Sequence, residues 1–411
     1  MNDMKYTSRQ RIAAALEHKE ADMVPFDFGG TRSTGINALA YRDLAAHLGM
    51  SKGNVRIYDL RQLLADIEPE IASLFGSDCV QLHRMAPSCG LKIDRYKPEM
   101  MMDGNIYDVP ADYNPVLLPD NSAGIADSTG RIVLKRLAGG LYFDDVYAPL
   151  ANVVEEKELD LISYPSISEE ETEFLARRAE ALFENTDDAI VAPLGISIFE
   201  KGIKDFGYEE WLMRIMTDEF IVTAYLERLA EAYMKIVDAF SETAGKFVQI
   251  VQGNDDLGMQ YAPLIPPEVY RKIFKPFHQR IFFHVKKKLP RARVLLHCCG
   301  SIYDLIPDLI EAGVDAINPV QINAEKMNPK ALKRDFGKDI TFWGGGVSTQ
   351  TTLSFGSVDE IADEVRRMMD IFADGGGFVF SPVHNIQAGV SPEKIVKVFE
   401  TAKSLRRYSN E

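Results

Sequence analysis

A histidine and a cysteine two residues apart, His297 and Cys299, have the types and spacing to hold a metal ion. They follow the apolar run 293–296, which predicts a β-strand. Because side chains alternate faces along a strand, we expect His297 and Cys299 to point the same way and Cys298 to point the opposite way. Imidazole and thiolate groups are ligands that zinc prefers, so this strand end predicts half of a zinc site.

A second predicted strand also ends in a histidine. The apolar run 377–383 is followed directly by His384. A catalytic zinc ion keeps three protein ligands and one open position, and we therefore predict that His297, Cys299 and His384 bind Zn²⁺. The alternative interpretation is structural, since cysteine also packs in apolar cores as a small hydrophobic residue.

Polar side chains follow several other predicted strands. We expect Asp255 or Asp256 to act as a catalytic carboxylate, either as a fourth metal ligand or as the partner of a ligand. The substrate-binding residues that we predict at the remaining strand ends are Asp27, Arg32, Gln321 and Asn385. A polar residue after a strand is also an ordinary start of a loop, so this prediction depends on the set and not on any one member.

The elements that must position these residues repeat along the chain. Eight short apolar runs predict strands, at residues 24–28, 78–82, 189–195, 247–253, 293–299, 316–320, 340–343 and 377–383. Most of them lack polar alternation, as expected for parallel strands buried on both faces. Stretches with the periodicity of amphipathic helices lie between most of the runs. This alternation predicts an α/β fold, a closed (β/α)₈ TIM barrel whose functional groups sit at the carboxyl ends of the strands.

Two regions are expected outside the barrel. The first is an N-terminal helical extension, 8–16, with Ser8 as its N-cap. The second is an insertion after the second strand, 90–165, in which turn signals separate short β-type runs and predict a small antiparallel meander. No linker rich in glycine, proline or serine divides the chain, so we predict a single domain over residues 1–411.

Charge and composition argue against several classes of function. The formal net charge of −15 disfavours a nucleic-acid partner, because binding phosphates requires a basic face. No run reaches eighteen apolar residues, and the N-terminus lacks the apolar segment of a signal peptide. Four cysteines, two of them adjacent, do not make a disulfide framework. We expect a cytoplasmic protein that binds neither membranes nor nucleic acid. Its oligomeric state is open, with a homodimer among the alternatives.

Several segments resemble the uroporphyrinogen decarboxylase superfamily. The resemblance begins at 7–11 and 22–25, and it is most specific in the C-terminal third of the chain. The segments that carry it further on are 253–258, 297–300, 318–321, 342–345, 376–379 and 381–387. The resemblance covers nearly the whole chain and implies the barrel fold that the strand pattern predicts.

The superfamily holds two chemistries, namely decarboxylation of a tetrapyrrole without metal and zinc-dependent methyl transfer to or from a cobamide. The resemblance is closest to the methyltransferases, whose coenzyme M enzymes carry a His-x-Cys pair and a later cysteine. Here His297 and Cys299 match the pair, and the later position is His384. No Asp-x-His-x-x-Gly pattern for binding a corrinoid is present, so the resemblance implies a cobamide supplied by a partner corrinoid protein.

We therefore expect a corrinoid-dependent methyltransferase that acts on a small methylated substrate, with O-demethylation of a methoxylated compound as the leading expectation. The first alternative is a tetrapyrrole decarboxylase. A substrate with eight carboxylates requires several arginines close together, whereas the segment 26–32 contains a single arginine, Arg32. The second alternative is a barrel without catalytic activity that serves as a binding module, and the cluster at the strand ends argues against it.

Overall fold

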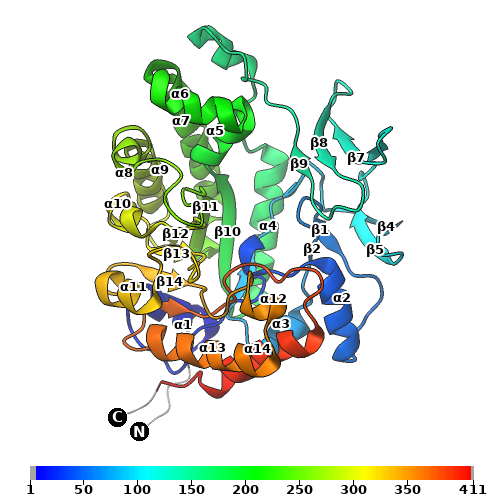
Figure 1. Ribbon diagram of the computed structural model, residues 1–411, viewed down its shortest axis with the longest axis vertical. Helices are drawn as coiled ribbons and strands as arrows, with labels where there is room; N and C mark the ends of the chain where they lie inside the picture. Colours follow the sequence, from blue (N-terminus) through cyan, green and yellow to red (C-terminus); the bar gives the residue numbers. More distant parts are fainter. Residues whose placement is uncertain (1–5, 409–411) are drawn as a thin grey trace.

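The computed structural model describes residues 6–408, and a curled parallel sheet of seven strands forms its centre (Figure 1). The strand order is β15-β14-β13-β12-β11-β10-β3. The strands are β3 (Cys79–Gln81), β10 (Ala189–Ile196), β11 (Ile250–Asn254), β12 (Arg293–His297), β13 (Ala316–Asn318), β14 (Thr341–Trp343) and β15 (Phe378–Val379). Each lies within or overlaps a predicted apolar run, so the prediction of a barrel-like parallel α/β fold is confirmed for these seven strands.

Helices follow the strands and cover the outer face of the sheet (Figure 1). The α-helices are α1 (Ser8–Leu16), α2 (Ala38–His47), α3 (Pro69–Phe75), α4 (Glu169–Asn185), α5 (Phe199–Phe206), α6 (Tyr208–Thr217), α7 (Glu219–Thr243), α8 (Pro267–Val269), α9 (Lys275–Lys288), α10 (Ile306–Glu311), α11 (Pro329–Phe336), α12 (Thr352–Phe355), α13 (Val358–Phe372) and α14 (Pro392–Ser404). Short helical turns are η1 (Arg32–Thr34), η2 (Glu156–Leu161), η3 (Gly245–Phe247), η4 (Tyr270–Phe274) and η5 (Tyr303–Leu305). Within residues 6–408, no helix combines the length and apolar character needed to cross a membrane.

The prediction of an eighth strand that closes the barrel is wrong. The segment 24–28 forms no ladder and contributes one isolated bridge, between Phe26 and Phe380. Its backbone nevertheless bonds to both edges of the sheet, since Asp27 N–H donates to Phe380 at 2.8 Å and Asp78 N–H donates to Phe26 at 2.7 Å. The segment is too short to pair further, because Pro25 has no N–H to donate and Gly29 turns the chain with φ +92°.

Asp78 ties this short segment to the rest of the protein. Its carboxylate is 1% exposed and accepts hydrogen bonds from Phe26 N–H at 2.8 Å, from Arg11 Nη1 at 3.2 Å and from Arg406 Nη2. Arg11 lies on α1 and Arg406 lies just beyond α14. One buried acid therefore joins the first helix, the unpaired segment and the C-terminal part of the chain.

The N-terminal helix α1 covers the predicted residues, but its cap differs from the prediction. Thr7, and not Ser8, is the N-cap, and its hydroxyl accepts a hydrogen bond from Gln10 N–H while the Gln10 side chain accepts from Thr7 N–H. The reciprocal pair is a capping box, which satisfies two donors that the first turn of a helix leaves free.

Antiparallel strands lie beside the barrel sheet (Figure 1, cyan). Between β3 and β10 the chain forms β4 (Tyr96–Met100), β5 (Ile106–Pro110), β6 (Val116–Leu117), β7 (Ala123–Ala126), β8 (Ile132–Arg136) and β9 (Asp144–Asp145). Strands β4 and β5 pair in one sheet and β6 to β9 in another. A further hairpin, β1 (Ile57–Asp59) with β2 (Leu64–Ala65), stands between these strands and the barrel.

We predict that Asp78→Ala lowers the free energy of unfolding by about 3–5 kcal/mol, because two buried guanidinium groups lose a charged partner. Asp363→Ala is the matched control. Its carboxylate forms an exposed ion pair with Arg366 on α13, and its loss should change stability by at most about 0.5 kcal/mol. Urea unfolding followed by circular dichroism measures both, and a loss below about 1 kcal/mol for Asp78→Ala would contradict the role described here.

Candidate metal centre

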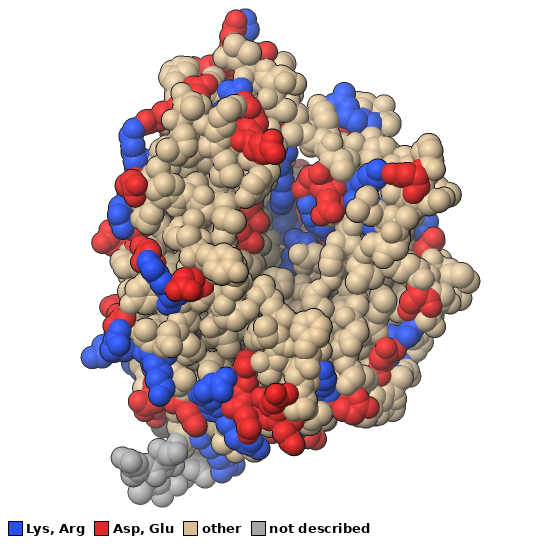
Figure 2. All heavy atoms as spheres, viewed as in Figure 1, with Lys and Arg blue, Asp and Glu red and all other residues tan. Residues whose placement is uncertain are grey.

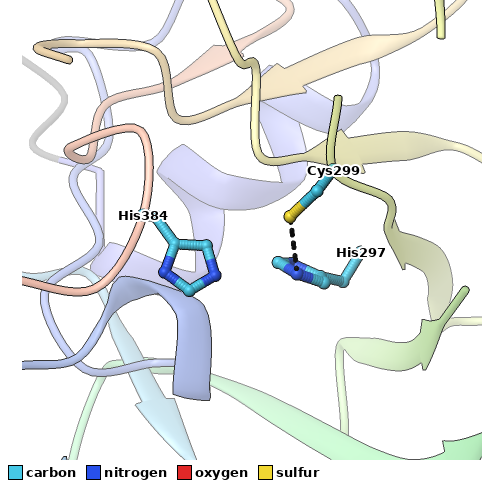
Figure 3. Close-up of side chains that lie close together, drawn as sticks. All are labelled: His297, Cys299 and His384. Carbon is cyan, nitrogen blue, oxygen red and sulfur yellow. Dashed lines mark hydrogen bonds between the residues drawn. The ribbon is translucent and has the colours of Figure 1, made fainter. Parts of the chain in front are cut away.

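The structure brings the three predicted metal ligands together at the carboxyl end of the sheet. One ligand atom each from His297, Cys299 and His384 lies within 4.8 Å of the others. Cys299 Sγ is 3.4 Å from His297 Nε2, and the two histidine rings are 5.5 Å apart between centroids. Figure 3 shows His384 reaching from its own loop toward the other two side chains. The cluster therefore joins the ends of β12 and β15, two strands that are not adjacent in the sheet.

His297 is oriented by the neighbouring strand. It is paired in register with Asn318 of β13, and its Nδ1 lies 2.8 Å from Asn318 Oδ1. The Asn318 amide is itself held, because its Nδ2 donates to the Trp343 carbonyl at 2.9 Å and its Oδ1 also accepts from the Ser33 hydroxyl at 2.6 Å. An amide oxygen only accepts, so Nδ1 of His297 carries the hydrogen. The lone pair of Nε2 is left to face Cys299 and His384.

The two adjacent cysteines differ as strand alternation predicts. Cys298 is fully buried, and its Sγ accepts a weak hydrogen bond from Leu257 N–H at 3.4 Å. Cys299 is partly exposed, and its N–H donates to Asp256 Oδ1 at 2.7 Å. Burial and then the Asp256 carboxylate raise the pKa of the Cys299 thiol. A cation is the partner that would favour the thiolate in this position.

The turn after Cys299 is held against a neighbouring loop. Gly300 has φ +89°, and a Cβ there would meet the backbone of Gly258 at 2.4 Å, so only glycine allows the two loops to approach. The Gly300 N–H donates to Gln321 Oε1 at 2.8 Å, and Gln321 Nε2 donates to Gln260 at 3.1 Å. Gln321 is thus close to the cluster, where its amide positions the turn that carries Cys299.

His384 borders a cavity of about 310 Å³ at the mouth of the barrel. The cavity is lined by Arg61, Gln62, Tyr142, Phe143, Asp144, His384, Asn385 and Gln387. Burial, followed by the nearby His297, lowers the pKa of His384 to about 4. Its imidazole is therefore neutral at ordinary pH, which is the form that binds a metal. Asn385 donates from Nδ2 to Gln62 Oε1 at 3.0 Å, which holds the wall of the cavity.

Charged side chains surround the same mouth, and Figure 2 shows a hollow there with acidic and basic groups on its walls. Arg32 pairs with Asp59 at 2.5 Å, and Arg61 pairs with Asp145. Burial raises the pKa of Glu200 to about 7, and the charge of Asp256 adds to this effect. A carboxyl group with that pKa holds a proton in part of the molecules near neutral pH.

Comparison with known proteins identifies the family. The profile of the uroporphyrinogen decarboxylase (URO-D) family matches residues 192–405, which include β10 to β15 and all three clustered side chains. The chain belongs to the URO-D family. The resemblance inferred from the sequence is thereby confirmed. No curated protein matches the sequence.

One solved structure matches the fold over nearly the whole chain. A methyltransferase from Methanosarcina mazei is 18% identical, with a TM-score of 0.59, and the match covers 97% of this chain and 99% of that one. The Ignisphaera aggregans GH53 catalytic domain is 12% identical over 92% of this chain and 99% of that one, with a TM-score of 0.36. The first likeness shows a shared fold along nearly the full length of both chains.

Two predicted carboxylates of the URO-D chain lie in structural positions. Asp255 was expected to be catalytic, but it is 1% exposed and its oxygens accept five hydrogen bonds. The donors are the Ser197 hydroxyl, the N–H groups of Ile198, Phe199 and Glu200, and His278 Nε2. Asp27 was expected to bind substrate, but it is fully buried and accepts from Trp343 Nε1 and Gly30 N–H, each at 2.7 Å. Both residues have a structural role in the interior, because their carboxylate oxygens are already hydrogen-bonded within the protein.

The other predicted residues reach the mouth. Asp256 is 39% exposed and its Oδ1 lies 3.7 Å from His297 Nε2, so it is the carboxylate beside the cluster. Arg32 is 30% exposed, and Asn385 lines the mouth cavity. Asn318 and Ser33 were missed as site residues. A polar residue at the end of an otherwise apolar strand is a signal for Asn318, whereas nothing in the sequence places Ser33 against a residue 285 positions away.

We predict that Asn318→Leu weakens zinc binding about 10- to 100-fold, because His297 loses the acceptor that fixes its ring orientation and tautomer. Ser33→Ala is the control, since it removes one donor to the Asn318 oxygen and keeps the bond to His297. Its effect should stay below about threefold. Competition with a chromogenic chelator measures the affinity. Equal losses in both variants, or no loss in Asn318→Leu, would show that this hydrogen bond does not position the ligand.

Proposed function

We propose that this protein is a zinc-dependent methyltransferase that moves a methyl group between a small methylated substrate and a corrinoid cofactor held by a partner protein. The observation that carries the proposal is the cluster of His297, Cys299 and His384 at the barrel mouth of a URO-D family chain. A methoxylated compound is the expected substrate. The methyltransferase of similar fold is in keeping with the proposal and leaves the substrate open.

The three side chains fit a zinc ion by chemistry, and the pair His297 and Cys299 also fits by spacing. Tetrahedral zinc with bonds of about 2.0 Å to nitrogen and 2.3 Å to sulfur holds its ligand atoms roughly 3.5 Å apart. The 3.4 Å between Cys299 Sγ and His297 Nε2 agrees with this value. His297 presents a lone pair from Nε2, and His384 is neutral. With one thiolate the bound ion would keep a net positive charge and one position for a substrate atom.

When bound, zinc would act as a Lewis acid on the heteroatom that carries the methyl group and make it a better leaving group. The protein supplies the rest of the chemistry. Asp256 holds the Cys299 backbone in place, and Asn318 orients His297. Glu200, with a pKa of about 7, is the group we assign to donate a proton to the departing oxygen.

The cavity beside His384 suits a small substrate. At about 310 Å³ it is at the lower end of the range for ligand pockets. Tyr142, Phe143 and Asp144, from the end of the antiparallel region, form one wall, and Asn385 and Gln387 form another. The opening between this wall and the barrel helices is where the partner corrinoid protein is proposed to approach (Figure 2).

Ion pairing at the mouth disfavours the decarboxylase alternative. A tetrapyrrole with eight carboxylates requires arginines that are free to bind it. Arg32 and Arg61 are already paired with Asp59 and Asp145. Asp144 and Asp256 add negative charge at the mouth, which favours a substrate without many negative charges.

The metal proposal predicts about one zinc per chain in protein purified without added metal. Cys299→Ser should lose most of the zinc, because serine is a far weaker ligand than a thiolate. Cys298→Ser is the matched control, since Cys298 is adjacent in sequence but buried on the opposite face. Elemental analysis with protein quantified by absorbance gives the ratio. Equal metal loss in the two variants would refute the arrangement, as would wild-type protein without metal.

The methyl-transfer proposal predicts that the protein, a reduced corrinoid protein and a methoxylated donor together form methylcobalamin. The carbon–oxygen bond breaks, the methyl group passes to Co(I) to give methyl-Co(III), and the oxygen takes up a proton. His384→Ala should lower the rate by on the order of 100-fold or more. The variant loses a proposed zinc ligand, and with it the Lewis acid that would activate the heteroatom. The absorbance change of the cobalamin follows the reaction.

Circular dichroism of His384→Ala serves as the control for folding. The rival activity is tested in parallel with uroporphyrinogen and metal-free protein. Release of carbon dioxide there, without methyl transfer from any donor, would establish the decarboxylase instead.

A further inference from the structure

A second polar cavity lies outside the barrel, away from the metal ligands. It has a volume of about 870 Å³ and is bordered by α3, α4 and the strand β3. An adjoining space of about 370 Å³ shares Arg56, Asp66, Asp108 and Arg178 with it. Neither space shares a lining residue with the cavity beside His384. We call the two adjoining spaces the outer groove.

The hairpin β1–β2 separates the outer groove from the barrel mouth. Arg61 and Gln62, in the loop of the hairpin, line the mouth cavity. Tyr58 and Asp66, at its strands, line the outer groove. The groove exists because α3 has seven residues, and such a short helix leaves the outer face of β3 incompletely covered.

Two arginines of the outer groove form no ion pair among the described residues, although Asp66 lies close enough to interact with both. Within residues 6–408, the Arg56 and Arg178 guanidinium groups have no hydrogen-bond or ion-pair partner, and Nε of Arg178 is buried. Arg56 lies over the ring of Tyr96, with 5.4 Å between its Cζ and the ring centroid. Arg56 is exposed, so Arg178 is the residue that points to a ligand. Buried donors in folded proteins are almost always paired, so the unpaired Nε of Arg178 indicates an acceptor supplied from outside.

A histidine in the same groove also has an unused ring nitrogen. The His83 side chain is 8% exposed, and its Nε2 lies 3.4 Å from Asp66 Oδ1. Its ring packs against Tyr58 at 4.1 Å between centroids. The second ring nitrogen, Nδ1, is buried and has no partner within the described residues. Three groups with unused hydrogen-bonding capacity, from His83, Arg56 and Arg178, thus border one groove.

Several acids line the groove, and some of them are already engaged. Asp66 faces His83, and Asp108 accepts from Asn54 at 3.0 Å. Asp78, at the base, binds Arg11 and Arg406. Glu68 Oε2 has no partner, and burial raises the pKa of that carboxyl. Asp94 and Asp188 also line the groove, so it holds acids as well as donors, and the donors without a partner among the described residues are those of Arg56 and Arg178.

We propose that the outer groove binds a small molecule with a carboxylate or phosphate group, which Arg178 and Arg56 receive, while His83 Nδ1 accepts a hydrogen bond from a donor elsewhere on the ligand. The planar fork of arginine suits both anions. Apolar side chains of Ile67, Val80 and Leu182 line the remainder of the groove and would contact the body of the ligand. The volume lies within the range of ligand pockets. This site is independent of the metal centre and of the activity proposed for it.

Titration calorimetry of the full chain at constant ionic strength tests the proposal, with benzoate and inorganic phosphate as separate probes. At least one probe should bind, and the stronger of the two identifies the anion class. Arg178→Met should weaken that binding tenfold or more. Arg177→Met is the matched control, since Arg177 is the adjacent residue of α4, is exposed and pairs with Glu173 at 3.7 Å. It should stay within about twofold of wild type. Cys299→Ser should also bind the probe as wild type does.

Arg56→Met provides a second variant at an exposed position if Arg178→Met fails to fold, and it should show the same direction of change. Absence of binding by either probe at millimolar concentration would overturn the proposal. Equal losses in Arg177→Met and Arg178→Met would overturn it too, because binding would then follow overall charge. Loss of binding in Cys299→Ser would place the anion at the metal centre instead.

Discussion

The candidate site depends on the register that aligns three neighbouring parallel strands. His297 is paired with Asn254 of β11 on one side and with Asn318 of β13 on the other, so these three strands end level with one another. This alignment lets Asn318 reach His297 Nδ1, and that hydrogen bond decides which ring nitrogen faces Cys299. A shift of one residue in β13 would turn Asn318 to the opposite face of the sheet. The geometry of the ligands is thus a consequence of strand pairing.

Buried carboxylates hold the loops that surround these strand ends. Asp255 accepts three backbone N–H groups at the start of α5, and Asp78 accepts the N–H of Phe26 together with two arginines. A carboxylate without partners is costly to bury, so acids in such positions become structural once their acceptors are used. Asp256 differs because it is 39% exposed and lies beside His297. All three acids follow or precede strands, so that position does not distinguish them. Asp256 differs from Asp255 and Asp78 because it is exposed and still has acceptor capacity.

Local patterns in the sequence were enough to predict seven strands, the three clustered side chains and the opposite placement of Cys298 and Cys299. Strand alternation acts over two residues, so the sequence displays it directly. The prediction of an eighth strand was wrong because the segment 24–28 forms a single bridge. How far this segment can pair depends on sheet edges that are distant in the sequence. The buried surroundings of Asp255 were not predicted, for a related reason. Its partners come from α5 and α9, and no local pattern shows where a buried side chain finds its donors.

The β1–β2 hairpin contributes to both polar cavities, through its loop at the mouth and through its strands at the outer groove. Adjacent residues of β1 face opposite ways, so Asp59 pairs with Arg32 at the barrel mouth while Tyr58 packs against His83 in the outer groove. The mouth gains a carboxylate that neutralises an arginine, and the groove gains an aromatic wall without charge. Arg178 lies in the groove without a hydrogen-bond partner for its buried Nε among the described residues. The hairpin therefore separates the cavity proposed for methyl transfer from the groove proposed to bind an anion.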